Sequence, residues 1–175
     1  MTHYVGIVQT NTIEEVDNIL APYNENLEVP EYKIFPSDEE IKTFLQYYSG
    51  NQFNQNLAYY VKLYGKNWDS WVLDEDLKPI KYSIYNPKAK YDWYKVGGRW
   101  NDIVQESTCL AKEIKGFFSE FDYLPSVYVN KEGWFEEKKF GWFGISIEIK
   151  ENKGIVARKL EENSEEKVFI VDFHI

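Results

Sequence analysis

The chain has 175 residues, of which 43% are hydrophobic and 28% charged, and its formal net charge at pH 7 is −9. This composition excludes a disordered chain, and the length fits one α+β domain over residues 1–175. The negative charge argues against nonspecific binding to nucleic acid or anionic membranes, because neutralising phosphates requires clustered Lys and Arg. A single cysteine, no basic leader and no long apolar stretch predict a cytoplasmic protein that does not enter a membrane.

The first part of the chain is expected to begin with a strand and then to be mainly helical. Residues 12–15 and 37–40 have the form of capping boxes, in which Ser or Thr precedes Glu by three residues at a helix start. After Ser37, apolar residues recur at the spacing of one helix face, and Gly50 is suited to end that helix. The pattern predicts a strand at 4–9, a helix from 12 to about 21, an extended segment at 31–35, a helix from 37 to 49 and a helix at 54–64.

The second part is expected to be mostly sheet, because short aromatic and β-branched runs are separated by Asp, Asn, Pro and Gly. The last run, KVFIVDFHI, has a continuous apolar centre, which predicts an interior place in the sheet. The predicted elements are strands at 70–73, 80–85 and 91–96, a helix at 108–118, a hairpin at 127–135, a strand at 142–149 and a closing strand at 167–175. The expected fold is α+β, with a mixed or mainly antiparallel sheet and two to four helices packed on it.

Residues 86–100, NPKAKYDWYKVGGRW, stand out because four cations and one acid give this segment a charge of +3 in an acidic chain. The cations alternate with aromatic rings, as on surfaces that bind anionic or aromatic ligands. Gly97 and Gly98 allow a tight turn with positive φ that exposes N–H groups to an anion, and Arg99 follows directly. The candidate ligand-binding residues are Asn86, Lys90, Asp92, Trp93, Gly97, Gly98, Arg99, Trp100 and, from outside this segment, Trp142.

The same residues also have a structural interpretation. Trp93 and Trp100 fit a hydrophobic core, where large rings are usually found. Arg99 is one of two arginines in the chain, and it fits an ion pair with the surplus acid as well as a bidentate contact to carboxylate or phosphate. The sequence leaves both interpretations open.

The two histidines lie at opposite ends of the chain, His3 in the first expected strand and His174 in the last. Asp172 and His174 are two apart on a strand and share a face, where the carboxylate can orient the imidazole. If the first and last strands pair, His3 joins them at one sheet end. The candidate catalytic residues are therefore His174, Asp172 and Arg99, although a solvent-facing histidine at a frayed terminus is the simpler interpretation. No metal ligand set or cofactor is predicted, and Cys109 is expected to be a buried structural residue.

In these motifs the chain resembles a family of uncharacterised proteins found mainly in bacteriophages, prophages and Gram-positive bacteria. The family motif is similar to NPxxKWDWYxIGGRW, which residues 86–100 match with Tyr91 where Trp is usual. The resemblance extends to residues 20–29, to residues 133–144 and to the VDFHI terminus. It implies an accessory or host-takeover role and no named activity. The shared positions are Asn86, Pro87, Lys90, Asp92, Trp93, Gly97, Gly98, Arg99, Trp100, Trp134, Gly141, Trp142, Asp172 and His174.

Two functions are consistent with these features. The first is a non-enzymatic accessory protein of phage or prophage type that counters a host defence system by binding a host protein or a small nucleotide-like anion. The alternative is a small enzyme acting on a phosphorylated or nucleotide-like substrate, with His174 as acid/base, Asp172 orienting it and Arg99 stabilising negative charge. A structural or assembly role is a third possibility, which an exposed aromatic patch outside any pocket would favour.

Overall fold

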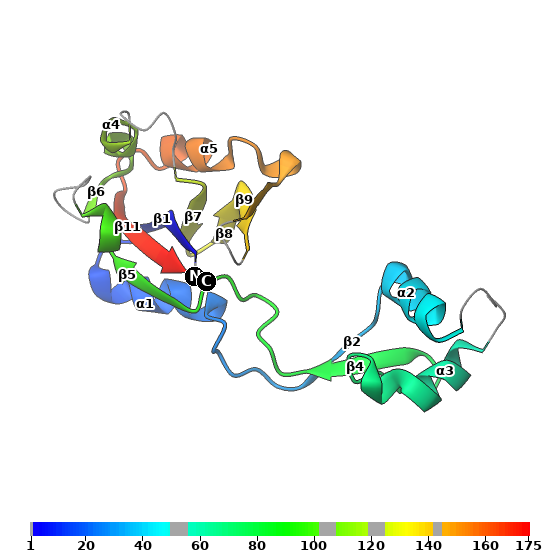
Figure 1. Cartoon of the computed structure of the whole chain (residues 1–175). Helices are drawn as coiled ribbons and strands as arrows, with labels where there is room; N and C mark the ends of the chain where they lie inside the picture. Colours follow the sequence, from blue (N-terminus) through cyan, green and yellow to red (C-terminus); the bar gives the residue numbers. More distant parts are fainter. Residues whose placement is uncertain (1, 50–55, 102–107, 119–124, 142–144) are drawn as a thin grey trace. The chain divides into compact units, whose positions relative to one another are not determined.

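The computed structural model of the chain describes residues 2–49, 56–101, 108–118, 125–141 and 145–175 (Figure 1). The chain groups into two compact units, one made of residues 1–27 and 86–175 and the other of residues 28–85. The smaller unit is therefore an insertion in the sequence of the larger one. A single domain over 1–175 stays a prediction. No helix within the described ranges has the length and apolar character needed to cross a membrane.

The larger unit is built on a six-stranded sheet in which one pair, β1 with β7, is parallel and the other pairs are antiparallel. Along the sheet the order is β5-β11-β1-β7-β8, and β6 pairs with the first part of β11. The strands are β1 (His3–Gln9), β5 (Trp93–Val96), β6 (Thr108–Leu110), β7 (Val127–Asn130), β8 (Gly133–Glu136) and β11 (Lys167–His174). The expected α+β class with a mainly antiparallel sheet is confirmed.

The first and last strands form the centre of this sheet, as the apolar run of the closing strand predicts. β1 and β11 pair over their whole length, from His3 opposite His174 to Gln9 opposite Val168. Every residue from Val168 to His174 is buried. Each fully buried Val, Ile or Phe contributes roughly 1.5–3 kcal/mol relative to an exposed one, so this strand pair supplies much of the stability of the unit.

Helices cover both faces of the sheet, as Figure 1 shows with α1 on one side and α4 and α5 on the other. Helix α1 (Ile13–Leu20) places Val16 and Leu20 against one face. Helices α4 (Ile114–Phe117) and α5 (Ile155–Glu162) cover the opposite face with Ile114, Val156 and Leu160. Two-sided coverage explains why the central strands read as continuous apolar runs instead of alternating patterns.

The smaller unit has its own core and a three-stranded antiparallel sheet in the order β2-β4-β3. Phe44, Val61 and Trp71 form its buried core cluster. The predicted capping box is present, since the Glu40 carboxylate accepts from the Ser37 N–H at 2.7 Å and the Ser37 hydroxyl accepts from the Glu40 N–H at 3.2 Å. The elements are β2 (Tyr32–Ile34), α2 (Asp38–Ser49), α3 (Leu57–Tyr64), β3 (Val72–Leu73) and β4 (Pro79–Ser83).

The predicted helix over 108–118 is wrong in its first half. Thr108–Leu110 is a strand, Ala111–Glu113 is a single 3-10 turn, and only Ile114–Phe117 is α-helical. The edge strand β5 pairs with residues 171–174 of β11, so the backbone at 167–169 is paired by β6. Thr and Cys have weak helix propensity. Pairing with residues 167–169 of β11 therefore decides the conformation of this segment.

Other predictions are corrected in detail. At the start of α1, the Thr12 side chain makes no capping bond, and Glu15 accepts instead from the Asn11 N–H and the Thr10 hydroxyl. The charged segment 150–166, which shows no clear pattern in the sequence, contains α5. In the predicted strand 142–149, residues 142–144 lie outside the described residues and Ser146–Glu148 forms β10, paired with an unpredicted strand, β9 (Lys138–Phe140).

Candidate functional site

Both histidines lie at one end of the main sheet, because the antiparallel pairing of β1 and β11 sets His3 opposite His174. The ring centroids are 4.9 Å apart. Trp93, on β5, is opposite His174 on its other side and stacks on it at 4.7 Å with an interplanar angle of 18°. Residues 3, 93 and 174 therefore form one row across three strands. This arrangement agrees with the expectation that the histidines meet if the terminal strands pair.

The carboxylate partners of the histidines differ from the predicted ones. Asp172 Oδ1 lies 3.0 Å from His3 Nδ1, whereas His174 Nδ1 lies 2.6 Å from Asp92 Oδ1. Residues two apart on one strand are separated by roughly 6.6 Å along the strand, so a neighbouring strand offers a closer partner. The prediction that Asp172 orients His174 is wrong, and Asp172 is placed to orient His3.

Arg99 and the two glycines complete the surroundings of Asp172. Gly97 and Gly98 both have positive φ, 72° and 52°, as the turn at this position requires. The turn brings the Arg99 N–H to 3.3 Å and the Arg99 Nε to 3.7 Å from Asp172 Oδ2. Arg99 thus forms the ion pair of the structural interpretation, while its side chain stays 56% exposed and accessible to a ligand.

The two imidazoles differ in the surroundings of their Nε2 atoms. His174 is only 3% exposed, and its Nε2 is buried without a hydrogen-bond partner among the described residues. The His3 side chain is 17% exposed, and no described residue bonds its Nε2. Only His3 therefore has a ring nitrogen available to a ligand.

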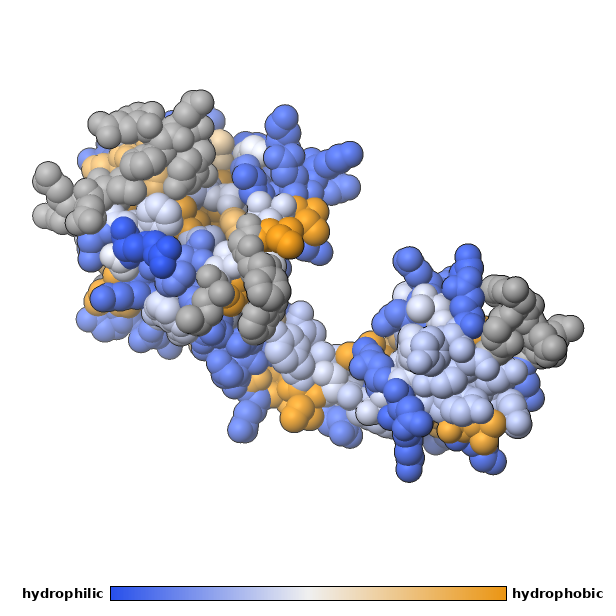
Figure 2. Space-filling view, in the orientation of Figure 1, coloured by the Kyte–Doolittle hydropathy of each residue, from blue (hydrophilic) through white to orange (hydrophobic). Residues whose placement is uncertain are grey.

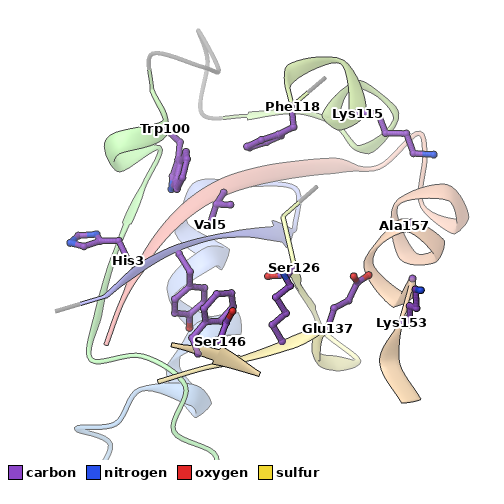
Figure 3. A pocket seen from close by; sticks show the side chains of 14 residues that line it. His3, Val5, Trp100, Lys115, Phe118, Ser126, Glu137, Ser146, Lys153 and Ala157 are labelled. Carbon is purple, nitrogen blue, oxygen red and sulfur yellow. The ribbon is translucent and has the colours of Figure 1, made fainter. Parts of the chain in front are cut away.

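A cavity of about 780 Å³ lies on the α4 and α5 side of the sheet, and His3 is part of its wall (Figure 3). Figure 3 shows His3 at one end, Val5, Trp100 and Phe118 along the middle, and Lys115 and Lys153 at the other end. This volume is within the range of small-molecule sites. The lining is largely apolar at Tyr4, Val5, Trp100, Phe118, Phe140, Gly154 and Ala157, with polar groups from His3, Lys115, Ser126, Glu137, Lys138, Ser146 and Lys153.

The charges in the cavity are mainly positive. Within the described part of the chain, none of Lys115, Lys138 and Lys153 has a carboxylate within ion-pair distance, although the whole chain is acidic. The one acid in the lining, Glu137, accepts a hydrogen bond from the Val156 N–H at 3.1 Å. The cavity therefore favours an anionic ligand.

Tyr4 contributes an aromatic wall and no charge. Burial is the main cause that raises the pKa of its phenol far above the usual value, so the group stays protonated. Its hydroxyl donates to the Lys90 carbonyl oxygen at 2.8 Å, and its ring stacks on Phe140 at 4.3 Å. The ring also stacks on Phe173 at 5.2 Å and only 5% of the residue is exposed, so Tyr4 is a buried, uncharged part of the cavity wall.

Several predicted ligand residues lie away from this cavity and hold structure together. The buried Asn86 amide donates to the carbonyl oxygens of Pro22 and Asn24 at 2.9 and 2.8 Å. Lys90 pairs with Glu136 at 2.6 Å, and this carboxylate also accepts from the Trp134 indole. Of the predicted residues, Trp100 lines the cavity, while Asp92, Trp93, Gly97, Gly98 and Arg99 surround the His–Asp pairs. Trp142 lies outside the described residues.

Sequence reasoning missed the cavity lysines and gave His3 only a supporting part. Lys115, Lys138 and Lys153 come from three separate segments of a chain with many lysines, and no local pattern marks them. In the part of the chain that the structure describes, no three His, Cys, Asp or Glu side chains are grouped as a metal site requires.

Cys109 is expected to react slowly with thiol reagents. Burial raises the pKa of its thiol to about 12, and Glu113 adds to this effect. The thiolate is the reactive form, so at pH 8 only a very small fraction is reactive in the folded protein. Labelling with a chromogenic disulfide reagent at pH 8 should be slow without denaturant and complete within minutes in guanidinium. Equal rates would show that the thiol is accessible in the folded chain.

Comparison of the chain with known protein families, with curated proteins and with solved structures finds no match. The resemblance to phage and prophage proteins therefore stays a prediction, and the site is interpreted from its own geometry.

Proposed function

We propose that this protein binds a small anionic ligand with an aromatic body, such as a nucleotide, in the cavity between the main sheet and α4 and α5. The observation that carries the proposal is that three lysines with no carboxylate partner among the described residues line a largely apolar cavity in an otherwise acidic chain. Lysine side chains at the cavity attract phosphate or carboxylate groups, and apolar side chains such as Val5, Trp100 and Phe118 suit an aromatic body. Binding is the core of the function, as the first sequence hypothesis has it.

The proposal is tested by a thermal-shift screen with AMP, cyclic AMP, NAD and sugar phosphates, followed by calorimetry of any hit. A ligand that binds only the folded protein raises its melting temperature by mass action. Decanoate serves as a second type of anion, with an aliphatic body. A response to decanoate but to no nucleotide would overturn the aromatic class, and no response to any probe would overturn the proposal.

Replacing two cavity lysines, Lys115→Met with Lys153→Met, should weaken the hit about 10- to 100-fold. Each lysine supplies a charge-assisted contact to the anion, and tenfold corresponds to about 1.4 kcal/mol. Lys112→Met is the matched control, since Lys112 lies on the same segment but pairs with Glu165 at 2.7 Å and does not line the cavity. Equal losses in Lys112→Met and in the double variant would contradict a site at the cavity.

A protein partner is a second candidate, because aromatic and apolar side chains of the smaller unit are exposed. Phe35, Tyr47, Tyr59 and Tyr85 are all more than half exposed. Figure 2 shows that much of the visible surface of this unit is of intermediate hydropathy, as tyrosines give. Exposed aromatic side chains are typical of interfaces. A stoichiometric partner from bacterial lysate that is lost with Tyr47→Ser and Tyr59→Ser would support this candidate. A host-defence role depends on the resemblance alone.

A further inference from the structure

We propose that His3, in a dyad with Asp172, is the acid–base residue of this site and hydrolyses a phosphate ester bound in the cavity. This inference rests on the proposed binding of a phosphate-bearing ligand there. It assigns the acid–base role to His3 and a structural role to His174.

The hydrogen bond to Asp172 determines which nitrogen of His3 is free to react. A carboxylate only accepts hydrogen bonds, so His3 Nδ1, 3.0 Å from Asp172 Oδ1, carries the proton of the neutral imidazole. The lone pair is then on Nε2, which has no partner among the described residues. The ring is held edge-on by Trp93 at 5.4 Å and by His174 at 4.9 Å. A dyad with a fixed tautomer and a free Nε2 is the arrangement that general acid–base catalysis requires.

Asp172 is itself held in place by its other oxygen. Oδ2 accepts from the Arg99 N–H at 3.3 Å and lies 3.7 Å from the Arg99 Nε. Gly98 allows this approach, because a Cβ at that position would lie 2.4 Å from the Asp172 Cβ. Asp172 is therefore a positioning residue, and the half-exposed Arg99 guanidinium places a positive charge close to the dyad.

His174 cannot take the same part. Its Nδ1 is bonded to Asp92, its Nε2 is buried, and it is not part of the cavity wall. A proton on His174 has no path of hydrogen bonds to a ligand among the described residues. His174 instead supports the Trp93 ring by stacking and the His3 ring by an edge-on contact.

The surroundings of His3 define the class of substrate. Val5 and Trp100, between His3 and the lysine end in Figure 3, suit an apolar or aromatic body. Arg99 does not line the cavity, but its exposed guanidinium beside the dyad suits an anionic reacting group. In the reaction, His3 Nε2 takes a proton from water as the water oxygen bonds to phosphorus and the ester P–O bond breaks. His3 then returns the proton to the leaving oxygen, so that ester and water become alcohol and phosphate without any redox change.

The test measures hydrolysis of bis(p-nitrophenyl) phosphate, a diester, and p-nitrophenyl phosphate, a monoester, by the full chain. The parent should release nitrophenol from at least one of them, and the active one identifies the ester class. His3→Gln should lower kcat at least about 100-fold, the usual contribution of general acid–base catalysis. Asp172→Asn, which keeps the shape of the side chain, should lower kcat with KM little changed. Circular dichroism melting confirms that each variant is folded.

A second measurement follows the ring nitrogens by 15N NMR, which is simple because the chain has two histidines. His3 should show a proton on Nδ1, and its Nε2 signal should move on addition of AMP, while the His174 signals stay unchanged. Absence of turnover by the parent, or full activity of folded His3→Gln, would overturn the dyad. Nucleotide binding without turnover would leave the proposed function standing and remove only this inference, whereas absence of binding would remove both.

Discussion

Replacing Gly98 by Ala is expected to lower the free energy of unfolding of the larger unit by about 2–5 kcal/mol. Gly98 has φ +52°, a left-handed conformation that costs an L-residue about 1–2 kcal/mol. The added Cβ would also lie 2.4 Å from Asp172 Cβ and 2.7 Å from Asp172 Oδ2. Asp172 is on a fully paired central strand and cannot move away freely, so overpacking adds about 1–3 kcal/mol.

Urea denaturation followed by circular dichroism measures this effect. Gly116→Ala is the matched control, because a Cβ there would meet no atom within 4 Å and its φ is not positive. That control should be neutral or slightly stabilising, since Ala favours helix over Gly. If Gly98→Ala unfolds at the same urea concentration as Gly116→Ala, the turn does not hold Asp172 as described. The displaced carboxylate should also alter the 15N signals of His3.

Truncating Phe173 to Ala is expected to lower the free energy of unfolding by about 3–5 kcal/mol, a large fraction of the stability of a typical domain. Phe173 is completely buried at the centre of the face that α1 covers. Its ring lies 5.2 Å from those of Tyr4 and Trp134 and 5.4 Å from that of Tyr91. These large side chains are held in place and cannot move into the space that the phenyl ring leaves. The void therefore stays open, and its full cost appears as a loss of stability.

The matching experiment compares thermal and urea midpoints of Phe173→Ala with those of Ile147→Ala. Ile147 is 66% exposed in the same unit, so its truncation should change stability by less than about 1 kcal/mol. Similar losses in the two variants would be inconsistent with the packing around Phe173. Because Phe173 lies between Asp172 and His174 in sequence but faces the other side of the sheet, a folded Phe173→Leu variant should keep its ligand affinity.

Local sequence patterns predict several elements correctly because they depend on neighbouring residues. The Ser37–Glu40 capping box, the helix after it and the apolar closing strand all need only periodicity and capping chemistry. The segment at 108–118 shows the limit of such patterns. Its first residues become a strand because the edge strand β5 does not reach residues 167–169 of β11, which pair with β6 instead. That opportunity is a property of the sheet and not of the segment.

The candidate site also combines features that the sequence predicts with features that only the tertiary structure decides. The residue types at 86–100, the positive φ at Gly97 and Gly98, and the possibility that two terminal histidines meet are all contained in the sequence. The pairing of carboxylates with imidazoles depended on the strand register. His3 meets Asp172 of the neighbouring strand β11, and His174 meets Asp92 just before β5, because these partners lie closer than a residue two apart on the same strand. The cavity and its three lysines were decided by tertiary packing alone, since they join segments far apart in the chain through the helices that cover one face of the sheet.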